Sequence, residues 1–147
     1  MKTLVTGATG FLGNAIARAL QKNGVEIKLL IRQSSNTSTI QDIDAENFVG
    51  DIRDPCSIKN ALRGCKHLYH VAADYRLWAR RPRDLYDNNV LGTKNIIKAS
   101  IKNKVKKIIF VSTDKAVYPS SDMGLSKRKA ELISLNSNSY DLATDWS

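Results

Sequence analysis

The sequence predicts an α/β fold in which a parallel sheet is covered by helices on both faces. Short apolar segments alternate along the chain with longer segments whose apolar residues recur at helical spacing. A glycine-rich turn, residues 7–13, joins the first apolar segment directly to the first helical one. With 147 residues, 42% of them hydrophobic, the chain has the size and composition of one globular domain.

Five short segments are predicted as strands because each is apolar and ends at a polar or glycine-containing loop. They are residues 2–6, 25–31, 48–49, 66–71 and 106–111. The third is the weakest, with only Phe48 and Val49 before Gly50. Residues 33–39 are polar and rich in Ser and Thr, which predicts a loop.

Four helices are predicted between and after these strands. The first begins at Phe11 and stops at Asn23-Gly24, since glycine favours a helix C-terminus. The second begins at Pro55, which suits a first helical position, and runs to Arg63. A long third helix covers residues 86–101, and the last covers residues 123–135.

Composition and charge narrow the class of protein. The net charge of +9 and the pI of about 9.7 favour an anionic ligand. Basic residues cluster at 76–83 and 98–107, but Trp78 is the one aromatic residue within these segments, so nucleic-acid binding is not predicted. The arginines at 76–83 follow the fourth predicted strand, where one or two of them could meet a diphosphate. No apolar run is long enough to predict a membrane span. Cys56 and Cys65 lack metal-site spacing, so we expect reduced thiols in a cytoplasmic protein without a metal centre.

The glycines of the first turn are spaced for phosphate binding. Gly7 relieves strain in a tight turn, a side chain at Gly10 would obstruct a pyrophosphate, and Gly13 lets the helix approach the strand. The helix that follows offers backbone N–H groups and a partial positive charge. The turn therefore predicts a dinucleotide site that also involves Thr9, Phe11 and Leu12. A purely structural tight turn is the alternative.

The stretch Thr-Gly-Ala-Thr-Gly-Phe-Leu-Gly at 6–13 resembles the extended short-chain dehydrogenase/reductases, the NAD-dependent epimerase/dehydratase type. Gly-Asp-Ile-Arg-Asp at 50–54, His-Val-Ala-Ala at 70–73 and Asn-Asn-Val-Leu-Gly-Thr at 88–93 follow in the family's order. The resemblance implies a Rossmann-type doubly wound sheet that binds NAD or NADP. The further cofactor-binding residues that it implies are Asp51, Ile52, Val71, Ala72, Ala73, Asn89 and Lys127.

Two stretches resemble different branches of this family. Residues 70–78 are similar to hopanoid-associated sugar epimerases and to dihydroflavonol-4-reductase-like proteins, whereas residues 111–119 are similar to nucleotide-sugar 4,6-dehydratases. The predicted function is therefore NAD(P)-dependent epimerase or dehydratase chemistry on a nucleotide sugar. An NADPH-dependent carbonyl reductase of the dihydroflavonol-4-reductase type and a non-catalytic dinucleotide-binding fragment are the alternatives.

The catalytic residues implied by the family depart from its usual pattern at one place. The family uses a Ser or Thr, a Tyr and a Lys, which Thr113 and Lys127 match, but Met123 occupies the position of the tyrosine. A thioether cannot transfer a proton in this pH range. A dehydratase subgroup resembles this chain in having Met there, and in it Asp114 would act as acid and Lys115 as base. Loss of catalysis is the competing interpretation.

The choice of cofactor is left open by the sequence. A carboxylate at the end of the second strand would hold the ribose hydroxyls of NAD, but this chain has Arg32 followed by Gln and two serines. A guanidinium pairs well with a 2′-phosphate, which favours NADP. The resemblance to epimerases and dehydratases, which recycle NAD, favours the opposite choice.

The resemblance also implies that the chain is incomplete. Family members are about twice as long, and residues 144–147 look like the lead-in to a further strand. We therefore expect residues 1–147 to form an NAD(P)-binding Rossmann domain that stops before the C-terminal substrate-binding part. The sequence leaves a homodimer open.

Overall fold

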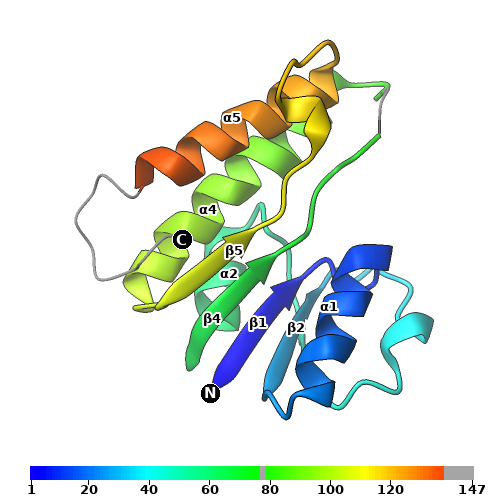
Figure 1. The fold of residues 1–147 in the computed structure, drawn as a ribbon, viewed down its shortest axis with the longest axis vertical. Coiled ribbons are helices and arrows are strands. Elements are labelled where there is room, and N and C mark those ends of the chain that lie inside the picture. Colours follow the sequence, from blue (N-terminus) through cyan, green and yellow to red (C-terminus); the bar gives the residue numbers. More distant parts are fainter. Residues whose placement is uncertain (77–78, 138–147) are drawn as a thin grey trace.

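The computed structural model describes residues 1–76 and 79–137 and shows one parallel sheet with helices on both sides (Figure 1). Its strands are β1 (Lys2–Thr6), β2 (Ile27–Ile31), β3 (Glu46–Val49), β4 (Cys65–His70) and β5 (Lys107–Phe110). They are arranged in the order β3-β2-β1-β4-β5. The order reverses between β1 and β4, which makes the sheet doubly wound, of the Rossmann type. The predicted fold class is confirmed.

The helices lie on both faces of this sheet. Helix α1 (Phe11–Lys22) covers one face, and α2 (Pro55–Ala61) and α4 (Gly92–Lys102) cover the other, with α5 (Asp122–Ser137) packed beside α4 (Figure 1). Helix α3 (Pro82–Tyr86) leads through a π-helical turn, Asp87–Leu91, into α4. Short 3₁₀ turns occupy Ser38–Ile40 and Asp114–Ala116.

Two apolar cores form because adjacent residues of a strand point to opposite faces. In β1, Leu4 belongs to the core under α2 and α4, and Val5 belongs to the core under α1. The first core includes Ile58, Leu62, Leu68, Ile96 and Ile108. The second includes Ala17, Ile27, Leu29 and Ile40. Central strands buried on both faces explain the continuous apolar runs in the sequence.

Some predicted element boundaries were wrong. Strand β2 begins at Ile27 and not at 25, because the Val25 N–H bonds to Leu20 O and closes the end of α1. Strand β3 begins at Glu46, since pairing with β2, and not apolar character, defines it. Helix α2 ends at Ala61, and α5 extends to Ser137. The predicted strand lead-in at 144–147 lies outside the described residues.

None of the helices within residues 1–76 and 79–137 is long and apolar enough to cross a membrane. In the same part of the chain, His, Cys, Asp and Glu side chains form no group of three or more that could hold a metal ion. Both cysteines are free thiols, Cys56 on the surface and Cys65 in the core.

Candidate functional site

A cavity of about 880 Å³ opens at the carboxyl ends of the strands, where ligands bind in open α/β sheets. Its walls come from the turn between β1 and α1, the ends of β2 and β3, the loop after β4, the segment after β5 and the first turns of α5. Most of the residues predicted from the sequence line it: Gly7, Thr9, Gly10, Phe11, Leu12, Gly13, Arg32, Ile52, Val71, Ala72, Ala73, Thr113, Met123 and Lys127.

The three glycines of the first turn meet different surroundings. Gly7 has φ +76°, and a Cβ there would lie 2.8 Å from the Ala72 nitrogen. A Cβ at Gly13 would lie 2.2 Å from the Gly7 oxygen, so the helix can approach the turn only without a side chain. At Gly10 the nearest atom would be 3.4 Å away, which is ordinary contact. Gly7 and Gly13 are thus required by the fold itself, whereas Gly10 is not.

The N-terminus of α1 is free to bind an anion. Gly10 is the N-cap residue and supplies no side-chain hydrogen bond, and the first turn has no acidic residue. The intrahelical ladder starts only with the Asn14 N–H to Gly10 O bond of 2.9 Å. The Gly10 N–H donates to Gly7 O at 3.0 Å, whereas the N–H groups of Phe11, Leu12 and Gly13 have no acceptor within the helix. These three residues line the cavity and lie at the end of the helix that carries a partial positive charge.

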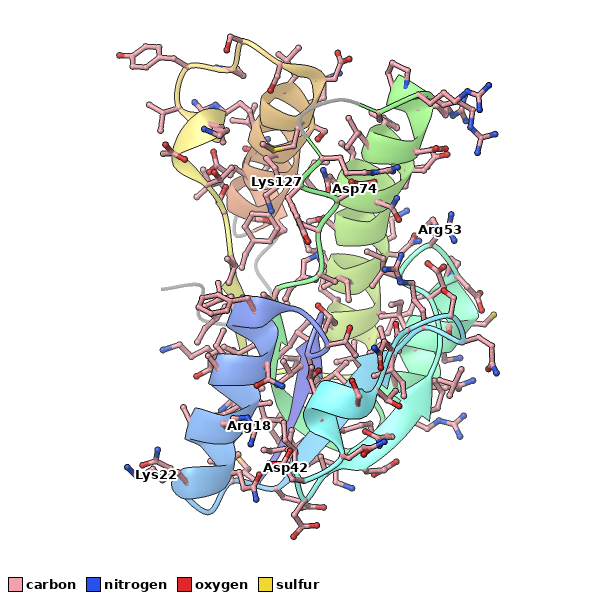
Figure 2. All side chains as sticks on the ribbon, turned by 90° about the vertical axis from the view of Figure 1, so that its right-hand side faces the viewer. Arg18, Lys22, Asp42, Arg53, Asp74 and Lys127 are labelled. Carbon is pink, nitrogen blue, oxygen red and sulfur yellow. The ribbon has the colours of Figure 1, made fainter. Side chains whose placement is uncertain are left out.

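Lys127 and Met123 form the opposite wall, one turn apart on α5. Figure 2 labels Lys127 there, and Asp74 on the loop after β4 at the same end of the sheet. Lys127 is only 6% exposed; its Nζ donates to Val111 O at 2.8 Å and lies 4.5 Å from the centre of the Phe110 ring. Burial lowers the pKa of Lys127 to about 8, so the ammonium form still dominates at neutral pH. Met123 is buried.

The Thr113-Asp114-Lys115 segment only partly faces the cavity. Thr113 lines it, whereas Asp114 and Lys115 are exposed on the 3₁₀ turn that follows and are not part of its wall. The Thr113 hydroxyl donates to Asp114 Oδ1 at 2.9 Å, and this bond, with the charge of Lys115, lowers the pKa of the Asp114 carboxyl. Asp114 is therefore an ionised carboxylate at neutral pH.

Two other predicted cofactor residues lie outside the cavity wall. Asp51 is paired with Arg53 at 2.6 Å, and this hydrogen-bonded pair lowers the pKa of the Asp51 carboxyl. Asn89 is buried behind the wall. Its amide accepts from the Asp74 N–H at 2.8 Å and donates to Asp74 O and to Ser126 Oγ, both at 2.9 Å. Asn89 thus ties the loop after β4 to α5.

Several residues of the cavity wall were not predicted. Thr6, Asp74, Tyr75, Asn88 and Ser112 line the cavity, and so does Arg76, which belongs to the basic group for which the sequence left a diphosphate contact open. Asp74 and Arg76 form an ion pair that Asn88 supports with a 3.4 Å contact to Asp74 Oδ2. For Asp74, Tyr75, Arg76 and Ser112 the available signal was their position soon after the end of a predicted strand, at the edge of the sheet where ligands bind.

A doubly wound sheet with a glycine turn at its switch point places the protein in the Rossmann class. Residues 3–146 match a family model described as polysaccharide biosynthesis protein, so the chain belongs to this family, within the extended short-chain dehydrogenase/reductases of the NAD-dependent epimerase/dehydratase type. The membership predicted from the sequence is confirmed.

Named relatives and solved structures agree with this membership. The chain is 37% identical over 146 residues to a UDP-glucose 4-epimerase of Rickettsia rickettsii, covering 91% of this chain and 43% of the epimerase. It is 36% identical over 118 residues to a provisionally named dihydroflavonol 4-reductase of Synechocystis, covering 80% of this chain and 34% of that protein. The crystal structure of Thermus thermophilus UDP-glucose 4-epimerase in complex with NAD superposes with a TM-score of 0.87 at 26% identity, covering 99% of this chain and 53% of that one.

The chain spans about half or less of the length of these relatives. What it shares with them is the Rossmann part, because the matched residues extend over nearly the whole chain and include every strand of the sheet.

Proposed function

We propose that residues 1–147 form an NAD(P)-binding domain that serves epimerase or dehydratase chemistry on a nucleotide sugar. The observation that carries the proposal is the cavity at the switch point, with the glycine turn on one side and Lys127 on the other. The names of the relatives, a UDP-glucose 4-epimerase and an epimerase in complex with NAD, support the same chemistry.

A dinucleotide would extend along the carboxyl edge of the sheet. The uncapped N-terminus of α1 beside Gly10 would hold the pyrophosphate, and Arg32 and Ile52 at the ends of β2 and β3 would contact the adenosine half. The nicotinamide half would then lie near Thr113 and Lys127. At this end the Lys127 ammonium would hold the ribose hydroxyls. The bound cofactor would supply hydride abstraction and return at a sugar carbon.

The end of β2 favours NADP over NAD. Arg32 lines the cavity, and among the described residues it has no ion-pair partner. The charge of Arg32 contributes to the lowered pKa of the Asp51 carboxyl, but this carboxylate is already paired with Arg53. A free guanidinium at this place can pair with a 2′-phosphate.

Calorimetric titration with NAD and NADP tests the cofactor proposal directly. We expect both to bind, with NADP the tighter, and R32Q to lose the advantage of NADP while it still binds NAD. R63Q removes an exposed arginine after α2 that does not line the cavity, so it is the matched control and should leave the ratio of the two affinities unchanged. If neither cofactor bound folded protein at millimolar concentration, the proposed function would be wrong.

Met123 favours a dehydratase over an epimerase or reductase that needs a tyrosine. In a 4,6-dehydratase, removal of the C5 proton and loss of the C6 oxygen would fall to Lys115 and Asp114. The ionised Asp114 would accept the proton that the C4 hydroxyl loses as hydride leaves C4, and it would then deliver this proton to the departing C6 oxygen. Both side chains are exposed beside the cavity, where a sugar held by the rest of the site could reach them.

Mass spectrometry of a UDP-sugar incubated with the protein and cofactor tests this assignment. A dehydratase releases water and leaves a 4-keto product, and D114N should abolish this while dinucleotide affinity is unchanged, because Asp114 lies outside the cavity wall. A large gain of epimerase activity in M123Y would contradict the dehydratase assignment.

A carbonyl reductase of the dihydroflavonol-4-reductase type is a second candidate, favoured by Arg32 and by the Synechocystis relative. It predicts oxidation of NADPH with a carbonyl substrate and no loss of water from a sugar. A non-catalytic domain, the remaining alternative, predicts tight cofactor binding without either reaction.

A further inference from the structure

His70 is a buried titratable residue that the proposed chemistry does not use. It ends β4, is 2% exposed and is not part of the cavity wall. Both of its ring nitrogens have hydroxyl partners: Nδ1 lies 2.9 Å from Thr6 Oγ1, and Nε2 lies 3.3 Å from Thr93 Oγ1. A buried imidazole with two specific partners links the strands to α4.

The bonds that Thr6 accepts fix the direction of every hydrogen bond in the series from Thr6 through His70 and Thr93 to Asn89. Thr6 Oγ1 accepts from the N–H groups of Val71 and Ala72 at 3.1 and 3.0 Å, so its own proton must be donated to His70 Nδ1. Nδ1 is therefore unprotonated, and Nε2 carries the proton and donates to Thr93. The Thr93 hydroxyl then donates to Asn89 O at 2.7 Å.

At the Thr6 end of this hydrogen-bonded series, the loop after β4 is held against the glycine turn. The Val71 and Ala72 amides that bond to Thr6 belong to residues of the cavity wall. The contact with the turn is close, since a Cβ at Gly7 would lie 2.8 Å from the Ala72 nitrogen. Packed interiors transmit small shifts, so a change at Thr6 would move this wall.

At the Asn89 end, the hydrogen-bonded series reaches α5, which forms the opposite wall of the cavity. Thr93 bonds to the Asn89 carbonyl, and the Asn89 amide bonds to Asp74 and to Ser126, the residue before Lys127. The same hydrogen-bonded chain therefore connects the glycine turn, the loop after β4 and the helix that carries Lys127.

We infer that His70 is a positioning residue for dinucleotide binding that acts through the Thr6 hydroxyl. Its neutral Nε2–H tautomer orients Thr6 so that Thr6 can accept from both amides of the loop. The inference rests on the proposed function, since it concerns the shape of the same cavity. If His70 had only a structural role, the dinucleotide affinity of each variant at this position would instead fall in step with its folding stability.

Two amide variants separate these roles. In H70N the Oδ1 atom takes the place of Nδ1 and keeps the bond from Thr6, whereas in H70Q the amide reaches toward Nε2 and the bond from Thr6 is lost. We expect the dissociation constant of the preferred dinucleotide to rise about tenfold in H70Q, the equivalent of one lost hydrogen bond, and about threefold or less in H70N. Equal affinities in the two variants, at any level, would overturn the inference.

If the variants at 70 do not fold, Thr6 provides a second pair. T6S keeps the hydroxyl and should bind dinucleotide nearly as wild type does, while T6V, of the same shape without it, should bind about tenfold more weakly. Equal binding by T6S and T6V would refute the inference.

The tautomer of His70 can also be measured directly, in protein that keeps both Thr6 and His70. The chain has two histidines, so in H67Q the ¹⁵N resonances of the imidazole report only His70. We expect the Nε2–H tautomer from pH 8 down to pH 5, and the Nδ1–H tautomer would refute the inference. Failure of wild-type protein to bind either dinucleotide would instead refute the proposed function, and the tautomer would still be measurable.

Discussion

Gly13 and Gly10 allow the roles of the glycine turn in folding and in binding to be separated. In G13A the new Cβ would lie 2.2 Å from Gly7 O, 2.6 Å from Gly7 C and 2.9 Å from the Ala8 nitrogen. All three atoms belong to the backbone, so the strand and the helix must move apart. Overpacking of this kind costs about 3 kcal/mol or more, a large part of the stability of a small domain.

In G10A the same methyl group meets only Gly7 O at 3.4 Å, and Gly10 has φ −88° and ψ 169°, which any residue adopts. The weaker N-cap and the smaller entropy of the unfolded chain nearly offset each other, so stability should change by less than about 1 kcal/mol. The methyl group does occupy space in the cavity wall where we place the pyrophosphate. We expect about a tenfold or greater loss of dinucleotide affinity.

Urea denaturation followed by circular dichroism gives the stability of both variants, and calorimetry gives the affinity of G10A. Stability of G13A equal to that of wild type would show that α1 can move away from β1 without cost, which would refute the packing explanation. Unchanged dinucleotide affinity in G10A would show that the turn does not hold the pyrophosphate.

Two predictions concern stability. Burial, together with the charge of Lys127, lowers the pKa of His70 to about 3, so below pH 6.5 the unfolded chain binds a proton that the folded chain does not. Stability should therefore fall by about 1.6 kcal/mol from pH 6.5 to 5, above the range where carboxylates titrate. The fall should be the same in H67Q as in wild type and absent in H70Q, and a flat profile in wild type would contradict the lowered pKa of His70. E46Q should lower the melting temperature more than E26Q, because Glu46 lies 3.1 Å from the nearly buried Lys28 ammonium, whereas the Glu26 carboxylate pairs, among the described residues, with Lys2 alone. The reverse order in differential scanning fluorimetry would refute this reasoning.

Much of the site could be predicted because its residues follow the strands in the sequence. The glycine turn is local: residues 7–13 carry their own spacing, and the strand before and helix after are visible in the same stretch. Met123 and Lys127 share a helix face by spacing alone. Chain-local features of this kind need no knowledge of what packs against them.

Other parts of the site depend on which side chains contact one another, and the sequence pattern does not show this. The resemblance implied that Asp51 binds cofactor, whereas the structure pairs it with Arg53 and leaves Arg32 facing the cavity. Likewise, the sequence shows Thr6 and His70 as two polar residues that are 64 positions apart. Their bond exists because β1 and β4 are neighbours in the sheet, with Thr6 opposite His70.

The sequence by itself determined the alternation of strands and helices, the glycine-rich turn and the family, because periodicity and glycine spacing are properties of adjacent residues. The tertiary structure alone decided which polar side chains are buried, paired or turned toward the cavity. Lys28 illustrates the difference: within an apolar strand it is nearly buried, and it is tolerated there because the neighbouring strand brings Glu46 within 3.1 Å. The free energy of a buried charge depends on its partners, and a fold brings partners together across any distance in sequence.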